Sequence, residues 1–528
     1  MGVKLRHIEL FAGCGGMTLG MKEAGFKLFF ANELSPMAGE TFAYNLLGTD
    51  LQGEKGNENV FWLKSHYPNT DLKSRLTENP FCYESGKFSD LDNKFDINGK
   101  LIIGNVDELL DVLKSNSKLL KAIKNERIEL LSGGPPCQSF SLAGKREKNS
   151  PKNSLPLTFA KIAGLIKPKV VLLENVKGIL APFSDGSHKY YAWLEVAKTF
   201  ALEGFVPVCM LLNSKHFGVA QNRSRYIMLA FEESFFKEVS VNCEKKKKVL
   251  KESYLFYKKV RKSRNDLSLV TTEDLNYYDA EEYDHLFDGI IFPKMTHYDS
   301  QLVSAFDAIS DIKHTNQNYS VEICADTYSG RLNRLFPSPD WIENPRVENH
   351  EPRKHSELVK ARFRLYQIIS SLASKERRCA NDLLKGRKVK PDDFKMLIQS
   401  LKAFNFYLEK GDEYVYAKLH SPKGFKNLFM NLRSKKNSQR ALLPAEPAPA
   451  QLTIPDDLCH FGMEQLRTMT VREMARFQSF PDWFEFRSKV TTGGSLRSFE
   501  VPQYTQVGNA VPPLLAKSLG EALLPILK

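Results

Sequence analysis

Short apolar runs alternate with segments of helical periodicity through roughly the first 230 residues. The runs have the length of buried strands, and they lie at residues 7–11, 27–31, 101–103, 128–131, 170–173 and 226–230. Helical patterns, such as residues 17–24, separate them. This alternation predicts an α/β domain built on a parallel, doubly wound sheet. Residues 50–100 are polar and weakly patterned, so we expect a surface insertion there.

The pattern changes after about residue 233, and the alternation is lost until about residue 460. Residues 244–264 carry ten Lys or Arg against two Glu, with aromatic residues interleaved, and residues 423–440 form a second basic stretch. Each stretch by itself is more typical of a solvated helix face than of a binding site. Residues 443–450 are rich in Pro and Ala, which predicts a linker or an extended segment.

Length, charge and cysteine content limit the number of domains and the kinds of partner that the protein can have. The chain has 528 residues, which predicts more than one domain, and a net charge of +13. Such a charge favours an anionic partner, most commonly nucleic acid, as much as it favours a merely solvated surface. None of the eight cysteines forms a C-x-x-C pair, so we expect no metal site and an intracellular protein with reduced thiols. No apolar run is long enough to span a membrane, and we expect no membrane partner.

A glycine-rich turn follows the first predicted strand. It reads Phe11-Ala12-Gly13-Cys14-Gly15-Gly16 and opens a helix, whose free N–H groups suit a carboxylate or phosphate. Thr18 stands where the dinucleotide pattern G-x-G-x-x-G requires its third glycine, which disfavours NAD. Glu33 ends the second strand, where a carboxylate can accept hydrogen bonds from ribose hydroxyls. S-adenosylmethionine has both a carboxylate and a ribose, and it fits this arrangement.

A second turn carries a cysteine. Gly133-Gly134-Pro135-Pro136 follows the strand at 128–131, and Cys137 comes directly after it. Open α/β sheets bind their ligands at the carboxyl ends of their strands. The position therefore makes Cys137 a candidate nucleophile.

These blocks, with others in a fixed order, resemble the cytosine-C5 DNA methyltransferases. The blocks that carry the resemblance are residues 11–16, 32–33, 135–138, 174–176, 221–225, 470–478 with 480–481, and 506–513. The resemblance implies a Rossmann-like, S-adenosylmethionine-dependent methyltransferase domain with a doubly wound mixed sheet and a smaller inserted target recognition domain. We expect the catalytic domain at residues 1–233, completed by 500–528, and the target recognition domain at 234–499.

By the same resemblance, Cys137 is the nucleophile. Its thiolate adds to C6 of cytosine and so makes C5 reactive toward a methyl group. Glu174 is implied to hold a proton at N3 of the base and to read its amino group. Arg225 is implied to reach the cytosine O2, and Arg223 and Gln221 to support the same pocket. Cys14 carries no family role through its side chain.

The resemblance also implies the cofactor and DNA contacts. The residues expected to bind S-adenosylmethionine are Phe11, Ala12, Gly13, Cys14, Gly15, Gly16, Glu33, Leu34, Asn105, Val106, Pro136, Asn509, Ala510 and Val511. The residues expected to contact DNA are Gln138, Ser139, Lys145, Arg146 and Gln221, mostly from a loop to about residue 153 that closes over a flipped cytosine. Asn105 stands where the family usually has Asp against the adenine amino group; its side-chain oxygen can still accept that hydrogen bond.

Two alternatives stay open from the sequence. One is a tRNA cytosine-C5 methyltransferase, because one branch of the family shares these motifs. The other is a catalytically silent DNA-binding protein that senses the cofactor. The basic region after residue 233 favours a domain that reads double-stranded DNA, and Cys137, Glu174 and Arg225 favour an active enzyme. The resemblance further implies a bacterial restriction-modification enzyme, cytoplasmic and nucleoid-associated, that is a monomer with a cognate endonuclease acting separately.

Overall fold

The computed structural model describes residues 5–53, 58–82, 86–91, 96–136, 154–185, 188–313, 319–323, 326–434, 439–451, 453 and 458–528. Its centre is a nine-stranded sheet in the order β12-β9-β11-β6-β5-β1-β2-β4-β3. The strands are β1 Leu5–Leu10, β2 Phe26–Glu33, β3 Val60–Trp62, β4 Lys100–Ile103, β5 Leu130–Gly133, β6 Val170–Val176, β9 Phe205–Asn213, β11 Ser224–Glu232 and β12 Tyr277–Asp279. Only β11 runs antiparallel to its two neighbours. The predicted doubly wound mixed sheet is confirmed.

Each strand predicted from an apolar run lies in this sheet. The region expected to be a plain surface insertion also contributes, because β3 pairs with β4 at the sheet edge. Two strands had no clear pattern. Strand β9 is buried along its whole length but contains Pro207, which is uncommon inside a strand, and β12 is only three residues long.

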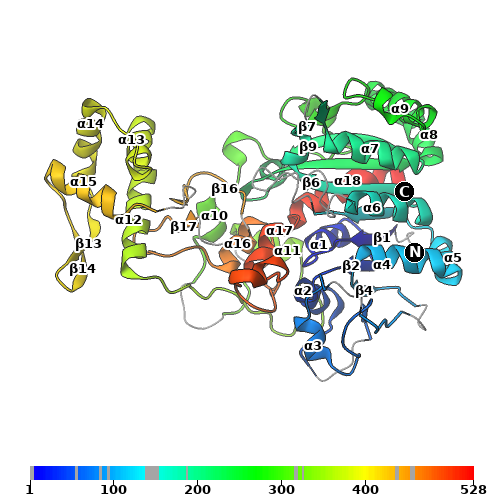
Figure 1. The fold of residues 1–528 in the computed structure, drawn as a ribbon, viewed down its shortest axis with the longest axis horizontal. Coiled ribbons are helices and arrows are strands. Elements are labelled where there is room, and N and C mark those ends of the chain that lie inside the picture. Colours follow the sequence, from blue (N-terminus) through cyan, green and yellow to red (C-terminus); the bar gives the residue numbers. More distant parts are fainter. Residues whose placement is uncertain are drawn as a thin grey trace.

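Helices pack around the sheet in the right half of the molecule (Figure 1). They are α1 Gly16–Glu23, α2 Pro36–Leu47, α3 Leu72–Thr77, α4 Val106–Ser115, α5 Ser117–Asn125, α6 Leu155–Ile166, α7 Ala192–Leu202, α8 Glu233–Asn242, α9 Lys247–Lys262 and α18 Pro513–Leu527. The last helix returns to the first: a Cβ built at Gly20 of α1 would lie 2.3 Å from the Pro513 carbonyl oxygen. Only glycine permits this approach, which brings the C-terminus beside the N-terminal turn.

Among the described residues, no single helix is both long and apolar enough to cross a bilayer. Only the segments Gly494–Asn509 and Pro513–Leu527 reach that composition when taken together, and a 65° bend separates them.

The first hydrophobic core extends beyond the expected boundary at residue 233. Phe236 of α8, Val249 and Phe256 of α9, and Met295 all belong to the core that surrounds the sheet. Strand β12 adds to the sheet edge by pairing with β9. The hydrophobic core around the sheet therefore extends to about residue 295, and the apolar face of the basic helix α9 packs on it. The run of basic residues predicted that one face of α9 is exposed. It could not predict which part of the protein the apolar face of α9 packs against.

A second core joins the C-terminal blocks to the middle of the chain. Its helices are α10 Ala305–Ile309, α11 Tyr328–Leu335, α16 Val471–Phe477 and α17 Gln503–Asn509. Short strand pairs link it to neighbouring segments: β10 Gln221–Asn222 with β16 Ala448–Pro449, and β15 Arg440–Ala441 with β17 Leu458–Cys459. A further pair, β7 Phe183–Asp185 with β8 His188–Tyr190, lies beside the main sheet. The Pro-rich segment predicted to be extended thus supplies β16.

Helix α16 is the centre of the second core and is held by buried charges. Thr470 and Glu473 form a capping box at its start. The Glu473 carboxylate also accepts hydrogen bonds from both terminal nitrogens of Arg467, at 2.8 and 2.7 Å. Although burial opposes it, the Arg467 hydrogen bonds and charge lower the pKa of Glu473 to about 2. The second half of α16 is held by Arg476, which pairs with Asp482 at 2.8 Å.

We expect Glu473→Gln to destabilise the protein by about 3–5 kcal/mol, because it leaves the buried Arg467 guanidinium without a counter-charge. The free energy of unfolding in urea at pH 7 measures this loss, and the exposed Glu464→Gln is the matched control. The pKa is depressed in the fold, so the contribution of Glu473 is present above about pH 4.5 and is lost as the pH falls toward about 2. A loss equal to that of the control variant would contradict this role.

A helical lobe with a third core projects from the rest of the molecule, at the left of Figure 1. Residues 357–434 form it. Its elements are α12 Glu357–Ser371, α13 Ser374–Leu384, α14 Pro391–Leu401, β13 Phe406–Lys410, β14 Glu413–Ala417 and α15 Pro422–Asn431. The second basic stretch begins in this lobe, in α15.

Candidate active site

The candidate site lies where the carboxyl ends of five parallel strands meet. The parallel register places the ends of β1, β2, β4, β5 and β6 at one edge of the sheet. The expected site segments lie at these ends or directly after them: Phe11 to Gly16, Glu33-Leu34, Asn105-Val106, Gly133 to Pro136, and Glu174-Asn175. Parallel α/β sheets bind ligands at this edge.

The glycine-rich turn is tied to the end of β2 through Glu33. One oxygen of the Glu33 carboxylate accepts from the Gly13 N–H at 2.8 Å, and the other from the Ser35 N–H at 2.8 Å. Burial raises the pKa of Glu33 although these hydrogen bonds oppose the rise. A Cβ at Gly13 would meet no atom within 4 Å, so open space lies in front of the turn there. Phe11 has a φ of 57°, a strained conformation of the kind that concentrates at ligand sites.

Thr18, at the position of the missing third glycine, is hydrogen-bonded to Glu9 in strand β1. Its hydroxyl donates a hydrogen bond to the buried Glu9 carboxyl in β1. Burial raises the pKa of Glu9 to about 8, which leaves this group protonated at neutral pH. Glu9 is an acidic residue inside an otherwise apolar strand, a signal from which its contact with Thr18 was not predicted.

The C-terminal segment closes on the same turn. A Cβ at Gly16 would lie 2.3 Å from the Val511 carbonyl oxygen, so the two backbones are in direct contact. Buried Arg223 holds this segment by donating to the carbonyls of Gly508 at 2.8 Å and Ala510 at 3.2 Å. Asn509 is exposed between them. Arg223 thus holds the segment 508–510 in place through its backbone carbonyls.

The end of β4 carries Asn105, which is exposed and caps α4. Its side-chain oxygen accepts from the Asp107 N–H at 2.9 Å, and an amide oxygen has a second lone pair. The side chain of Val106 is buried in the first core, and Leu34 is half-buried beside the β2 end.

Glu174 and Arg225 form an ion pair at the next strand ends. Arg225 Nε lies 2.6 Å from Glu174 Oε1, and both side chains are about nine-tenths buried. In the antiparallel register of β6 and β11, Arg225 pairs with Val176 and Ile227 with Glu174, so Glu174 and Arg225 are diagonal neighbours on one face. A Cβ at Gly134 would lie 3.0 Å from Glu174 Oε2, and Asn175 Nδ2 donates to the Pro135 carbonyl at 3.1 Å. The pair therefore sits against the turn that leads to Cys137.

The side chains of Gln221 and Cys14 are both buried, so neither lies at the protein surface. The Gln221 side chain is fully buried and its oxygen accepts from the Gln451 N–H at 3.4 Å, so in this structure it braces β10 against the β16 segment instead of facing DNA. The Cys14 thiol is buried, with its sulfur 3.9 Å from the Gln506 carbonyl oxygen. Burial raises its pKa to about 12, which keeps it protonated and unreactive.

Part of the expected site lies outside the described residues: Cys137, Gln138, Ser139, Lys145 and Arg146. Pro136, the last residue described before them, is exposed at the edge of the sheet. Within the described part of the chain, no group of three or more His, Cys, Asp or Glu side chains could hold a metal ion.

Comparison with known proteins assigns the class. The profile of the C-5 cytosine-specific DNA methylases matches residues 5–72 and 102–524, and the chain belongs to this family. It is a DNA (cytosine-5)-methyltransferase, an enzyme class that uses S-adenosylmethionine. This confirms the resemblance and does not favour the tRNA-directed or silent alternatives.

Individual relatives are distant but cover nearly the whole chain. The type II methyltransferase M.DdeI of Desulfomicrobium norvegicum is 26% identical over 98% of this chain and 88% of its own length. M1.HphI of Haemophilus parahaemolyticus is 24% identical over 99% of this chain and 87% of its own length. A solved prophage-encoded E. coli protein, described as a DNA modification methyltransferase, shares the fold with a TM-score of 0.51 at 16% identity, covering 99% of both chains.

Proposed function

We propose that this enzyme is a modification methyltransferase that methylates C5 of a flipped cytosine in a specific double-stranded DNA sequence through a covalent Cys137 adduct. The observation that carries the proposal is the buried Glu174–Arg225 pair, held against the Gly134-Pro135 turn beside the glycine-rich loop. The two groups suit the Watson–Crick edge of one cytosine, which carries O2, N3 and the amino group. A carboxyl group can act at N3 and the amino group, and a guanidinium can donate to O2.

The described residues fit S-adenosylmethionine. Open space in front of Gly13 leaves room for it, and the Glu33 carboxylate beside that space suits the ribose hydroxyls. We assign the adenine amino group to Asn105, apolar contact with adenine to Phe11 and Leu34, and the remaining contacts to the turn from Ala12 to Gly16, to Val106 and Pro136, and to Asn509, Ala510 and Val511. When bound, the cofactor supplies an electrophilic methyl group.

Three side chains, those of Cys137, Glu174 and Arg225, make C5 of the cytosine reactive. The Cys137 thiolate forms a bond to C6, and the electron pair of the C5–C6 double bond moves to C5, where it is shared with N3. Glu174 holds a proton at N3, which removes the negative charge from the ring, and Arg225 fixes O2. After methylation, the C5 proton leaves to solvent water, its electron pair re-forms the C5–C6 double bond, and the bond from C6 to the Cys137 sulfur breaks to release the thiolate. Arg223 acts as a positioning residue, because its described contacts are with the C-terminal segment.

The type II relatives support a restriction-modification setting. We propose a monomeric enzyme of the bacterial cytoplasm, working on nucleoid DNA, with a cognate endonuclease that acts separately. We assign Gln138, Ser139, Lys145 and Arg146 to contacts with DNA around the flipped base.

Transfer of a labelled methyl group tests the function. We expect label in unmethylated genomic DNA, as 5-methylcytosine in one sequence context, and none in bulk tRNA. Transfer to tRNA alone would contradict the proposal.

We expect Asn105→Asp to bind S-adenosylmethionine about three- to tenfold more tightly. A carboxylate is a stronger acceptor for the adenine amino group than an amide oxygen, by about 1 kcal/mol. Calorimetric titration measures the affinity. Asn116→Asp is the matched control, because Asn116 caps α5 in the same way, away from the strand ends. Weaker binding by Asn105→Asp would rule out this contact.

A further inference from the structure

The helical lobe, residues 357–434, holds most of the net charge of the protein. It contains 17 Lys or Arg and eight Asp or Glu, a net charge of +9 out of +13 for the whole chain. The other 450 residues are therefore nearly balanced. A charge that is concentrated in one projecting lobe marks a surface for an anionic partner more strongly than a charge spread over the chain does.

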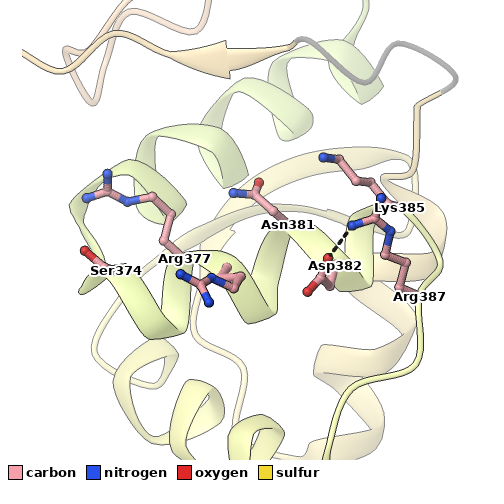
Figure 2. A pocket seen from close by; sticks show the side chains of 7 residues that line it. Ser374, Arg377, Asn381, Asp382, Lys385 and Arg387 are labelled. Carbon is pink, nitrogen blue, oxygen red and sulfur yellow. Dashed lines mark hydrogen bonds and ion pairs between the residues drawn. The ribbon is translucent and has the colours of Figure 1, made fainter.

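One face of α13 and the turn after it gather this charge around a hollow. The hollow has a volume of about 390 Å³, and Figure 2 shows its lining side chains. The lining residues are Ser374, Arg377, Arg378, Asn381, Asp382, Lys385 and Arg387. On α13 they recur at intervals of three and four, which places them on one side of the helix. The opposite side, with Cys379 and Ala380, packs into the core of the lobe.

The cations of this face are mostly uncompensated. Asp382 is the only acid in the lining, and it pairs with Arg387 at 3.0 Å. The side chains of Arg378 and Lys385 are exposed and make no hydrogen bond or ion pair with any other described residue. The Arg433 guanidinium adds a fifth cation nearby, since its Nη1 lies 3.1 Å from the position of a Cβ at Gly386. A lining this polar does not suit an apolar ligand.

The shape of the cluster suits a chain of phosphates. Arg378 and Lys385 are seven residues apart, or about 10 Å along the helix, a length over which one DNA strand presents about three phosphates. Figure 1 shows α12 and α13 on the side of the lobe toward the catalytic sheet, with α14, α15 and the β13–β14 hairpin on the far side. A duplex bound at the active site could therefore also meet this face.

We propose that the α13 face binds backbone phosphates of the DNA substrate, independently of base sequence, and so anchors the duplex away from the flipped cytosine. The proposal rests on DNA being the substrate. Guanidinium groups form paired hydrogen bonds with phosphate oxygens, and each phosphate that is neutralised releases counterions. The lobe would thus supply affinity, while the bases are read elsewhere.

Binding of a random-sequence 60-base-pair DNA duplex to the full chain tests this. The test variant is R378Q/K385Q/R387Q; Arg377 stays because it also donates to the Leu372 carbonyl. The control K402Q/K410Q/K418Q removes the same charge from exposed positions elsewhere in the lobe. We expect the test variant to raise Kd roughly tenfold and to reduce the slope of log Kd against log salt by about 3, with a much smaller change for the control.

If the test and control variants weaken DNA binding equally, the proposal is overturned. The overall positive charge of the lobe, and not the α13 face, would then account for the effect. Unchanged binding by the test variant would overturn it too. A loss confined to a 60-base-pair RNA duplex would point to RNA instead. Thermal unfolding of each variant verifies that the lobe is folded. Failure of the proposed function would show differently, as absence of methyl transfer by the unmodified enzyme.

Discussion

Cys137→Ala is expected to reduce methyl transfer to genomic DNA to background, a loss of at least about 10⁴-fold. Without the thiolate no bond to C6 forms, and C5 of cytosine is then too poor a nucleophile to react. The turn that leads to Cys137 is held by the Asn175–Pro135 hydrogen bond and packs against Glu174, so the substitution leaves the described site intact. DNA binding should therefore change by no more than a few-fold.

A covalent trap separates the chemistry from folding effects. In DNA whose cytosines carry fluorine at C5, the C5 proton needed for release is absent, so the unmodified enzyme should remain attached to DNA under denaturing conditions. The Cys137→Ala variant should form no such complex. Cys82→Ala is the matched control, because Cys82 is exposed and distant in sequence from the strand ends. Undiminished transfer by Cys137→Ala would refute the covalent mechanism.

The second large effect is expected for Glu174→Gln. Glutamine keeps the size of the side chain but cannot give a proton to N3, and removing a general acid of this kind typically costs about 10²–10⁴-fold in rate. The ion pair with Arg225 at 2.6 Å is lost as well, which frees the guanidinium that should bind O2.

Single-turnover rates and DNA affinity should be measured together for this variant. We expect the rate to fall while Kd for DNA changes by less than about fivefold, because the group acts on the base and not on the backbone. Glu195→Gln is the control, since Glu195 lies on α7 and pairs with Lys198. A rate within threefold of the unmodified enzyme would show that Glu174 is not needed for proton transfer.

Local patterns in the sequence predicted much of the fold and of the site. Apolar runs such as residues 170–173 marked strands because burial in a sheet requires them. The glycine-rich turn at residues 13–16 marked the start of α1 for an equally local reason. Strand β9 was not predicted; its apolar run contains Pro207, a residue that is uncommon inside a strand.

The sequence alone determined the chemistry available at each turn: a thiol after Gly-Gly-Pro-Pro, a carboxylate after β2, a carboxyl and a guanidinium at the ends of β6 and β11. Those features depend on neighbours within a few residues. Tertiary structure decided which of them meet. Arg223 contacts the Gly508 carbonyl 285 positions away, and the apolar face of α9 packs on the core around the sheet. Charge and periodicity describe one face of a helix, whereas the partner of the other face is selected by packing across the whole chain.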